Sequence, residues 1–181
     1  MPALAIWTPE DGLLGALAPL GAALAAPPAL VIDLDPSGPA YPGERSLADL
    51  VADEPTLKDL TPRSGVAVVR NGGIAPSEAA GVVGSLLQSW ERVVLRLPPR
   101  PEPQADFPIV PVRLLLPGWL AGPAEPAVWQ TIPEWARMPI AGVRLPVPER
   151  ATVRALLAGR RPWRSRWIRA WRSVWKARWE R

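Results

Sequence analysis

The chain has 181 residues; 48% are hydrophobic, 25 are prolines, and none is cysteine or histidine. This hydrophobic fraction excludes a disordered chain, and the length suits one domain with a packed core. Without cysteine and histidine, disulfides, thiol nucleophiles, histidine acid–base catalysis and His/Cys metal sites are excluded. The net charge of +4 is distributed unevenly, as the end of the chain shows.

The first 35 residues predict one strand–turn–helix–strand unit. Its parts are an apolar strand at 4–7, a Pro/Gly-containing turn at 8–12, an Ala/Leu-rich helix at 13–25, and a second buried strand at 29–34. Asp33 and Asp35 lie at the end of that second strand. A strand that leads through a glycine-containing turn into a helix is the frame of a phosphate-binding loop.

The uncharged stretch 12–32 raises the question of a membrane span or a signal peptide. Pro19, Pro27 and Pro28 interrupt it, which a lipid-exposed span tolerates poorly. A signal peptide begins with basic residues, whereas the first basic side chain here is Arg45. We therefore expect a buried helix and strand in a cytoplasmic protein.

The rest of the chain alternates between strand and helix patterns. The expected elements are a short helix from Ser46 to Val51, a strand at 65–69, a helix at 76–89, a strand at 93–97, a strand at 109–116, a helix at 127–137 with Trp129 and Trp135, a strand at 140–145, and a helix at 148–158 followed by Gly159. Five or six strands alternating with helices predict an α/β fold, with a mostly parallel sheet and helices on both faces.

Several stretches along the chain resemble the MinD/ParA family of deviant Walker A ATPases, which includes pilus-localisation and septum-site proteins; besides those that follow, they include the runs 46–55 and 140–150. The stretch 6–17 (IWTPEDGLLGAL) resembles the family's strand and K-G-G-x-G-K-[ST] loop, and Asp33-Leu34-Asp35-Pro36 resembles its D-x-D-P strand end. The stretch 93–99 (VVLRLPP) resembles its V-I-I-D-x-P-P strand. The resemblance implies a P-loop NTPase-like fold over residues 1–159. An ordinary α/β unit without ATPase ancestry remains the alternative.

The functional side chains of that family are missing. Glu10 takes the place of the signature lysine, Gly15 that of the phosphate lysine, and Ala16 that of the magnesium-binding hydroxyl. Arg96 stands where the resemblance implies a metal-sensing aspartate. We therefore expect a degenerate nucleotide site with no cofactor, no metal and no catalytic residue, and we interpret Asp33 and Asp35 as strand-end or turn residues. The vestigial positions are Glu10, Asp11, Gly12, Gly15, Asp33 and Asp35.

Residues 160–181 hold the basic character of the protein. Nine cations against the single acid Glu180 give this segment a net charge of +8, so residues 1–159 carry −4. Five tryptophans recur at every fourth position, and at about 100° per residue they form a slowly winding stripe on a helix. The stripe consists of Trp163, Trp167, Trp171, Trp175 and Trp179, and the cations outside it include Arg166, Arg169, Arg172 and Lys176.

A tryptophan face against a basic face is typical of an interfacial helix. These residues therefore predict a C-terminal amphipathic helix that binds an anionic membrane surface. Two alternatives stay open: the stripe docks on this domain or on a partner protein, or the segment binds nucleic acid.

Together these features predict a non-catalytic, MinD/ParA-like adaptor at the inner face of the cell membrane. It would localise a protein partner, such as an active MinD/ParA-type ATPase or a pilus-assembly or division component. The competing functions are a nucleotide sensor or weak ATPase using Asp33 and Asp35, and a nucleic-acid-binding module using the basic tail.

Overall fold

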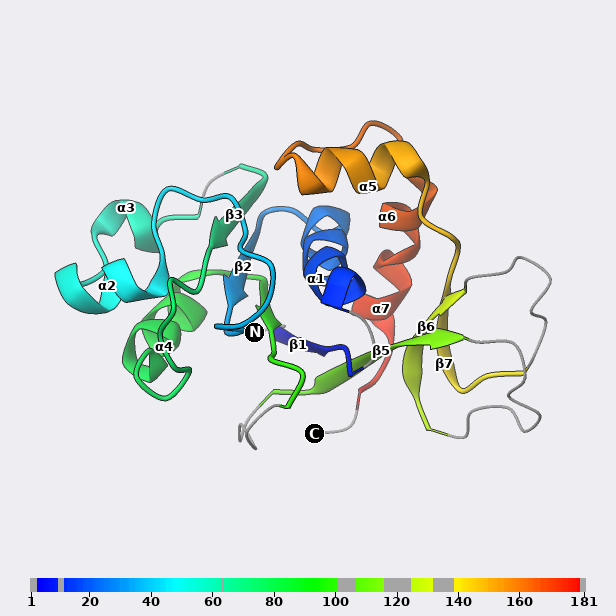
Figure 1. Cartoon of the computed structure of the whole chain (residues 1–181), viewed down its shortest axis with the longest axis horizontal. Coiled ribbons are helices and arrows are strands. Elements are labelled where there is room, and N and C mark those ends of the chain that lie inside the picture. Colours follow the sequence, from blue (N-terminus) through cyan, green and yellow to red (C-terminus); the bar gives the residue numbers. More distant parts are fainter. Residues whose placement is uncertain are drawn as a thin grey trace.

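The computed structural model describes residues 3–9, 12–62, 64–100, 107–115, 125–131 and 139–179. In these ranges seven parallel strands form one sheet in the order β3-β2-β4-β1-β5-β6-β7 (Figure 1). The strands are β1 (Ala3–Trp7), β2 (Ala29–Asp33), β3 (Val66–Val69), β4 (Val93–Arg96), β5 (Ile109–Leu115), β6 (Ala127–Thr131) and β7 (Gly142–Leu145). The predicted α/β fold is confirmed.

Helices cover both faces of the sheet. They are α1 (Gly12–Ala25), α2 (Leu47–Asp53), α3 (Leu57–Leu60), α4 (Ala80–Ser89), α5 (Arg150–Leu157), α6 (Arg166–Ala170) and α7 (Arg172–Lys176). Because side chains alternate along a strand, Val31 of β2 packs in the cluster that contains α1, whereas Leu30 and Ile32 pack in the cluster with α2 and α4. Figure 1 shows α1 surrounded by α5, α6 and α7, and α2, α3 and α4 grouped apart from them.

Helix α1 lies between the sheet and the C-terminal helices. Eight of its 14 residues are alanine or glycine, and ten of the 14 are buried. A helix buried on nearly all sides shows little amphipathic pattern, and its small side chains allow close approach by its neighbours. This packing explains the uncharged stretch of the sequence without a membrane span.

The predicted helix at 127–137 is wrong in its described part. Residues Ala127–Thr131 form β6, which pairs with β5 on one side and β7 on the other. The run Ala-Val-Trp-Gln-Thr contains β-branched and aromatic residues that suit a buried strand, and all five residues are buried. Trp135, the second tryptophan of the predicted helix, lies outside the described residues.

Other boundaries differ less. The helix predicted at 76–89 begins at Ala80, after turn residues. Ser46 caps the N-terminus of α2: its hydroxyl accepts from the Asp49 amide, and the Asp49 carboxylate accepts from the Ser46 amide. Gly159 follows α5 with a φ of 64°, as expected for a helix C′ position. The short helix α3 has no counterpart among the predicted elements.

The predicted C-terminal amphipathic helix over residues 160–181 is not confirmed as one continuous helix in the described part. Residues 160–164 are not helical, and α6 and α7 are five residues each, meeting at Trp171. At the junction the Trp171 amide donates to the Ile168 carbonyl, three residues back, which is a tighter turn than an α-helix makes. The change of direction lets the segment follow the surface of α1 instead of projecting from it.

Candidate functional site

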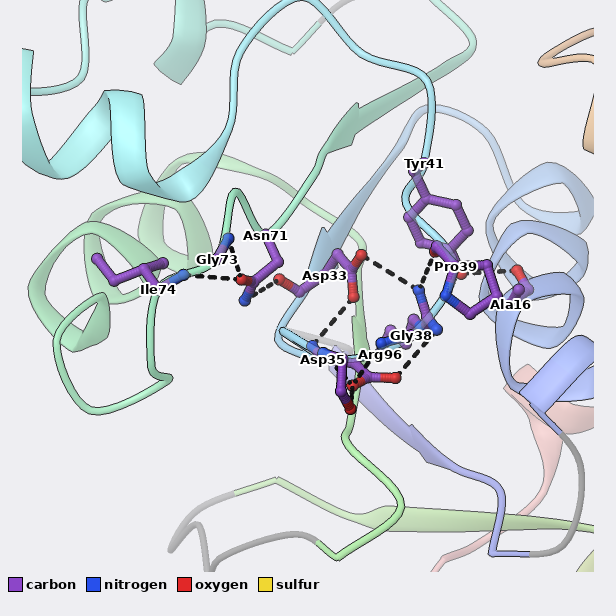
Figure 2. A network of polar contacts seen from close by, with 11 residues as sticks. Ala16, Asp33, Asp35, Gly38, Pro39, Tyr41, Asn71, Gly73, Ile74 and Arg96 are labelled. Carbon is purple, nitrogen blue, oxygen red and sulfur yellow. Dashed lines mark hydrogen bonds and ion pairs between the residues drawn. The ribbon is translucent and has the colours of Figure 1, made fainter.

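The carboxyl ends of β2 and β4 form a buried ionic cluster. Asp33 and Arg96 are direct neighbours in the parallel register of these strands. Arg96 Nη1 lies 3.2 Å from Asp33 Oδ2, and Nη2 lies 3.0 Å from Asp35 Oδ2 (Figure 2). The three side chains are 2%, 2% and 6% exposed, so these are ion pairs shielded from water. One guanidinium therefore faces two carboxylates.

The turn after β2 is built around this guanidinium. Asp35 Oδ1 accepts hydrogen bonds from the Ser37 amide, the Ser37 hydroxyl and the Gly38 amide. A β-carbon on Gly38 would collide with the Arg96 guanidinium and the Asp35 carboxylate, so glycine is required there. The Pro39 carbonyl accepts a further bond from Arg96 Nη1 at 2.8 Å. The turn thus covers the charged end of Arg96.

Tyr41 completes the cover. Its ring lies 5.1 Å from the guanidinium carbon of Arg96, within the range of a cation–π contact. Its hydroxyl donates to the Ala16 carbonyl of α1 at 2.6 Å (Figure 2). Burial raises the pKa of the Tyr41 hydroxyl, so it stays protonated and holds the loop against α1. Tyr41 therefore connects the loop, the ionic cluster and the first helix.

The ionised form of Asp33 is disfavoured by burial in this cluster. Burial raises the pKa of its carboxyl group to about 6, although the Arg96 charge and the hydrogen bond from the Asp35 amide act in the opposite direction. Asn71 supports the same edge from the end of β3: its side-chain amide donates to the Asp33 carbonyl, and its oxygen accepts from the Gly73 and Ile74 amides. The charged groups of the cluster therefore bind to other groups of the protein.

The position of this cluster matters because open parallel sheets bind ligands at the carboxyl ends of their strands. Here Arg96 and Tyr41 fill the space beside β2 and β4. Asp33 ends its strand and Asp35 opens the turn, as predicted. Within the described ranges no three acidic side chains gather as a metal-ion site.

The vestigial loop is described only in part. Gly15 lies against Thr8, where a β-carbon would come 2.6 Å from the Thr8 hydroxyl oxygen. Gly12 begins α1, and Ala16 is buried with its carbonyl bound by Tyr41. Glu10 and Asp11 lie outside the described residues.

Sequence reasoning missed Tyr41, Gly38 and Pro39, which lie in a Gly/Pro-rich loop with no periodic pattern. The sequence does contain one signal, because Arg96 lies at the end of an otherwise apolar strand. A charged side chain that is buried there needs an acidic partner. Asp33 and Asp35 end the strand that the chain brings beside it.

The second candidate site is the C-terminal segment, and here two predicted membrane-binding residues need correction. Trp167 and Trp171 are 1% and 0% exposed and belong to the core cluster of α1. Their rings meet edge to face, 5.5 Å apart, above Gly21 of α1. A helix residue without a side chain leaves room for both rings. In this conformation neither ring is available to lipid.

Hydrogen bonds fix the docked segment. Trp167 Nε1 donates to Gln130 Oε1 of β6 at 2.7 Å, and Trp175 Nε1 donates to the Ala22 carbonyl of α1 at 2.9 Å. Trp179 Nε1 donates to the Val174 carbonyl. Of the predicted stripe, Trp175 and Trp179 are half-buried, and Trp163 is 85% exposed.

Glu149 anchors the start of the segment. Its carboxylate accepts from the Thr152 hydroxyl of α5, from the Ser165 hydroxyl and from the Arg166 amide, at 2.9, 2.9 and 2.8 Å. Although partial burial acts against it, these hydrogen bonds lower the pKa of Glu149 to about 2. Glu149 therefore joins the first turn of α5 to that of α6.

The cations of the segment face outward. All eight in the described part of it are exposed, and no acid stands among them: Arg160, Arg161, Arg164, Arg166, Arg169, Arg172, Lys176 and Arg178. The docking of the tryptophans therefore leaves a basic surface with Trp163 exposed beside it. The predicted polar face is retained, whereas most of the predicted apolar face is used inside the protein.

Comparison with family models, curated proteins and solved structures finds no match to this chain. Among the helices of the described ranges, none has the length and apolar character needed to cross a membrane.

Proposed function

We propose that this protein is a non-catalytic adaptor that attaches to an anionic membrane surface through the basic outer face of residues 160–178. The observation that carries the proposal is the eight exposed cations of this segment, whose described residues include no acidic side chain. Each cation near an anionic leaflet contributes roughly 1 kcal/mol. Trp163 is placed to enter the headgroup layer, which tryptophan prefers.

The adaptor part of the proposal rests on the ionic cluster. Arg96 pairs with both carboxylates at the carboxyl edge of the sheet, and the Tyr41 ring covers Arg96, so these described side chains occupy one another rather than a phosphate group. A degenerate MinD/ParA-like origin belongs to this proposal; the strand–turn–helix frame and the D-x-D-P stretch support it. Its partner would be an active ATPase of that type, or a component of pilus assembly or division-site selection, at the cytoplasmic face of the membrane.

Vesicle co-sedimentation tests the membrane contact. The full chain should bind anionic vesicles, should bind zwitterionic vesicles far more weakly, and should lose affinity as salt rises. Changing Arg166, Arg169 and Lys176 to Gln should remove most of the binding. The matched control changes Arg70, Arg92 and Arg154 to Gln, three arginines outside the segment, and should retain the binding. Equal loss in both variants, or tighter binding to duplex DNA than to vesicles, would overturn the proposal.

Calorimetry with ATP and Mg²⁺ tests the adaptor part. No binding is expected at micromolar affinity. Such binding would instead favour the nucleotide-sensor function, and Asp35→Ala would then show whether the cluster takes part in it.

A further inference from the structure

A small hollow lies at the C-terminal end of α1, where four arginines surround it. It has a volume of about 130 Å³ and is formed by Leu24 and Ala25 together with residues of the C-terminal segment. The arginines that line it are Arg161, Arg164, Arg169 and Arg172, and none of the described residues that line it is acidic. In the described part of the chain none of the four has an acidic partner. Four like charges around one hollow repel one another until an anion enters.

The backbone adds a second observation at this hollow. Arg164 has a φ of 57°, a left-handed conformation that is strained for a residue with a side chain. Its guanidinium lies 5.8 Å from the Trp163 ring. The planar fork of arginine matches the oxygens of a phosphate group, which several arginines can bind at once.

A larger groove begins at the same place. It has a volume of about 570 Å³, within the roughly 300–1,000 Å³ of small-ligand pockets, and runs between α1, β3 and the end of α5. Its apolar lining includes Leu20, Leu24, Val66, Val68 and Leu156. Leu24 and Arg161 line both the groove and the arginine hollow, so the two adjoin.

The cations that line the groove differ in their pairing. Arg45 pairs with Asp59 at 2.9 Å, and Lys58 pairs with Glu44 at 3.7 Å, so these two cations are neutralised within the protein. Arg160 and Arg161 have no such partner in the described residues. An occupant with one charged end would therefore place it toward Arg161.

An added peptide strand fits this groove poorly. Strand β3 is the edge of the sheet in the described ranges, but the loop before α2 runs along it. A β-carbon on Gly43 would lie 3.2 Å from the Val68 carbonyl oxygen, and the Leu47 amide donates to the Arg70 carbonyl. Because these groups occupy the edge, its backbone is not free to pair with another strand.

We infer that the two adjoining hollows bind one anionic phospholipid molecule, with its phosphate among Arg161, Arg164, Arg169 and Arg172 and one acyl chain along the groove. The inference rests on the proposed function, because it names the lipid contact that the basic surface makes. It goes further in that a single lipid is held in a defined site, rather than a bilayer being attracted by charge alone.

Calorimetry on the full chain tests the site, with octanoyl lysophosphatidic acid below its critical micelle concentration as the probe. This lipid should bind with one-to-one stoichiometry. Monooctanoylglycerol has the same chain without the phosphate, and glycerol phosphate has the phosphate without the chain; each should bind at least roughly tenfold more weakly. Glycerol phosphate binding as tightly as the lipid would overturn the lipid assignment in favour of a simple anion site.

Two sets of variants locate the contact. The double change Arg161→Gln and Arg172→Gln should weaken binding of the soluble lipid roughly tenfold or more, and Val66→Phe, which narrows the groove, should weaken it without a change of charge. The matched control, Arg166→Gln with Arg178→Gln, removes two exposed cations that line neither hollow. It should leave soluble-lipid binding within about twofold while reducing vesicle binding.

The outcomes separate the two proposals. If the chain binds anionic vesicles but not the soluble lipid, the lipid site is overturned while the membrane contact stands. The same holds if the Arg161/Arg172 double variant and the Arg166/Arg178 control lose soluble-lipid binding equally. If the chain binds the soluble lipid and the Arg161/Arg172 double variant does not, but the chain does not bind vesicles, the lipid site is supported and membrane attachment fails.

Discussion

At the scale of single residues, Arg96 has the largest consequences, because it is a charged side chain on a strand that is otherwise apolar and buried. Arg96→Met leaves Asp33 and Asp35 buried without their counter-ion. Removing one partner of a buried ion pair costs about 3–5 kcal/mol. We therefore expect the free energy of unfolding, measured by urea denaturation at pH 7, to fall by that amount. Arg92→Met is the control: its contact with Glu91 is 3.9 Å long and exposed, so the loss should stay below about 1 kcal/mol.

The titration of Asp33 should lower the stability of the folded protein as the pH rises, whereas most carboxyl groups lower it as the pH falls. Its pKa is raised from 3.8 to about 6 in the folded protein, so the folded state holds the proton more tightly than the unfolded state does. The stabilisation from protonated Asp33 is fully present below about pH 4 and is lost as the pH rises through about 6. Over this range it amounts to roughly 3 kcal/mol.

Asp33→Asn should remove this loss, so the unfolding free energy of the variant, relative to the natural chain, should rise between pH 4 and 6. Asp49→Asn is the control, because hydrogen bonds from Ser46 lower the pKa of Asp49 and its contribution is lost as the pH falls. A difference between Asp33→Asn and the natural chain that stays constant from pH 4 to 6 would contradict the assignment.

Residue by residue, the sequence predicts the charged members of the cluster better than its apolar cover. Asp33, Asp35 and Arg96 lie at the ends of recognisable strands, and parallel strands bring their ends to one edge. Tyr41 follows a loop of prolines and glycines whose path depends on tertiary packing. Its hydrogen bond to the Ala16 carbonyl joins positions 25 residues apart, and no local pattern specifies that contact.

At the scale of elements, the docking of the C-terminal segment depends on the surface of α1. A β-carbon on Gly21 would lie 2.5 Å from the Trp167 ring and 2.6 Å from the Trp171 indole nitrogen. Gly21→Ala should therefore displace both rings and destabilise the protein by about 1–3 kcal/mol in thermal or urea unfolding, despite the better helix propensity of alanine.

Gly84→Ala in α4 is the matched control, since a β-carbon there meets nothing within 4 Å. It should be neutral or stabilising by up to about 1 kcal/mol. If Gly21→Ala behaves like Gly84→Ala, the tryptophans do not pack on α1 as described.

The sequence reveals the four-residue spacing of the tryptophans but not their partner. That spacing is equally compatible with a lipid surface and with a groove in the protein. In the structure the tryptophans pack on the protein for two reasons. The alanines and Gly21 of α1 form a surface without long side chains, and Gln130 accepts a hydrogen bond from Trp167. The strand that carries Gln130 was itself predicted as a helix, so this contact could not be foreseen.

At the scale of the whole molecule, residues 160–179 contribute buried side chains to the core. Trp167, Trp171 and Val174 belong to the same cluster as β1, β2 and β4 of the sheet. Trp167 also reaches β6 through Gln130, and Glu149 joins the segment to α5. The same segment therefore exposes its cations to solvent and buries its tryptophans against α1.

A chain ended at Gly159 would lose these buried side chains and uncover α1. Removing a buried tryptophan costs about 3–5 kcal/mol, and two of them together approach the whole stability of a typical domain, about 5–15 kcal/mol. We therefore expect the shortened chain to lose cooperative unfolding in circular dichroism and to aggregate. In the full chain Trp167→Ala should cost about 3–5 kcal/mol, whereas Trp163→Ser, at an exposed position, should change stability by less than about 0.5 kcal/mol. A shortened chain that unfolds cooperatively with the stability of the full chain would show that the segment is an appendage, free to leave α1 for a membrane with its tryptophans exposed.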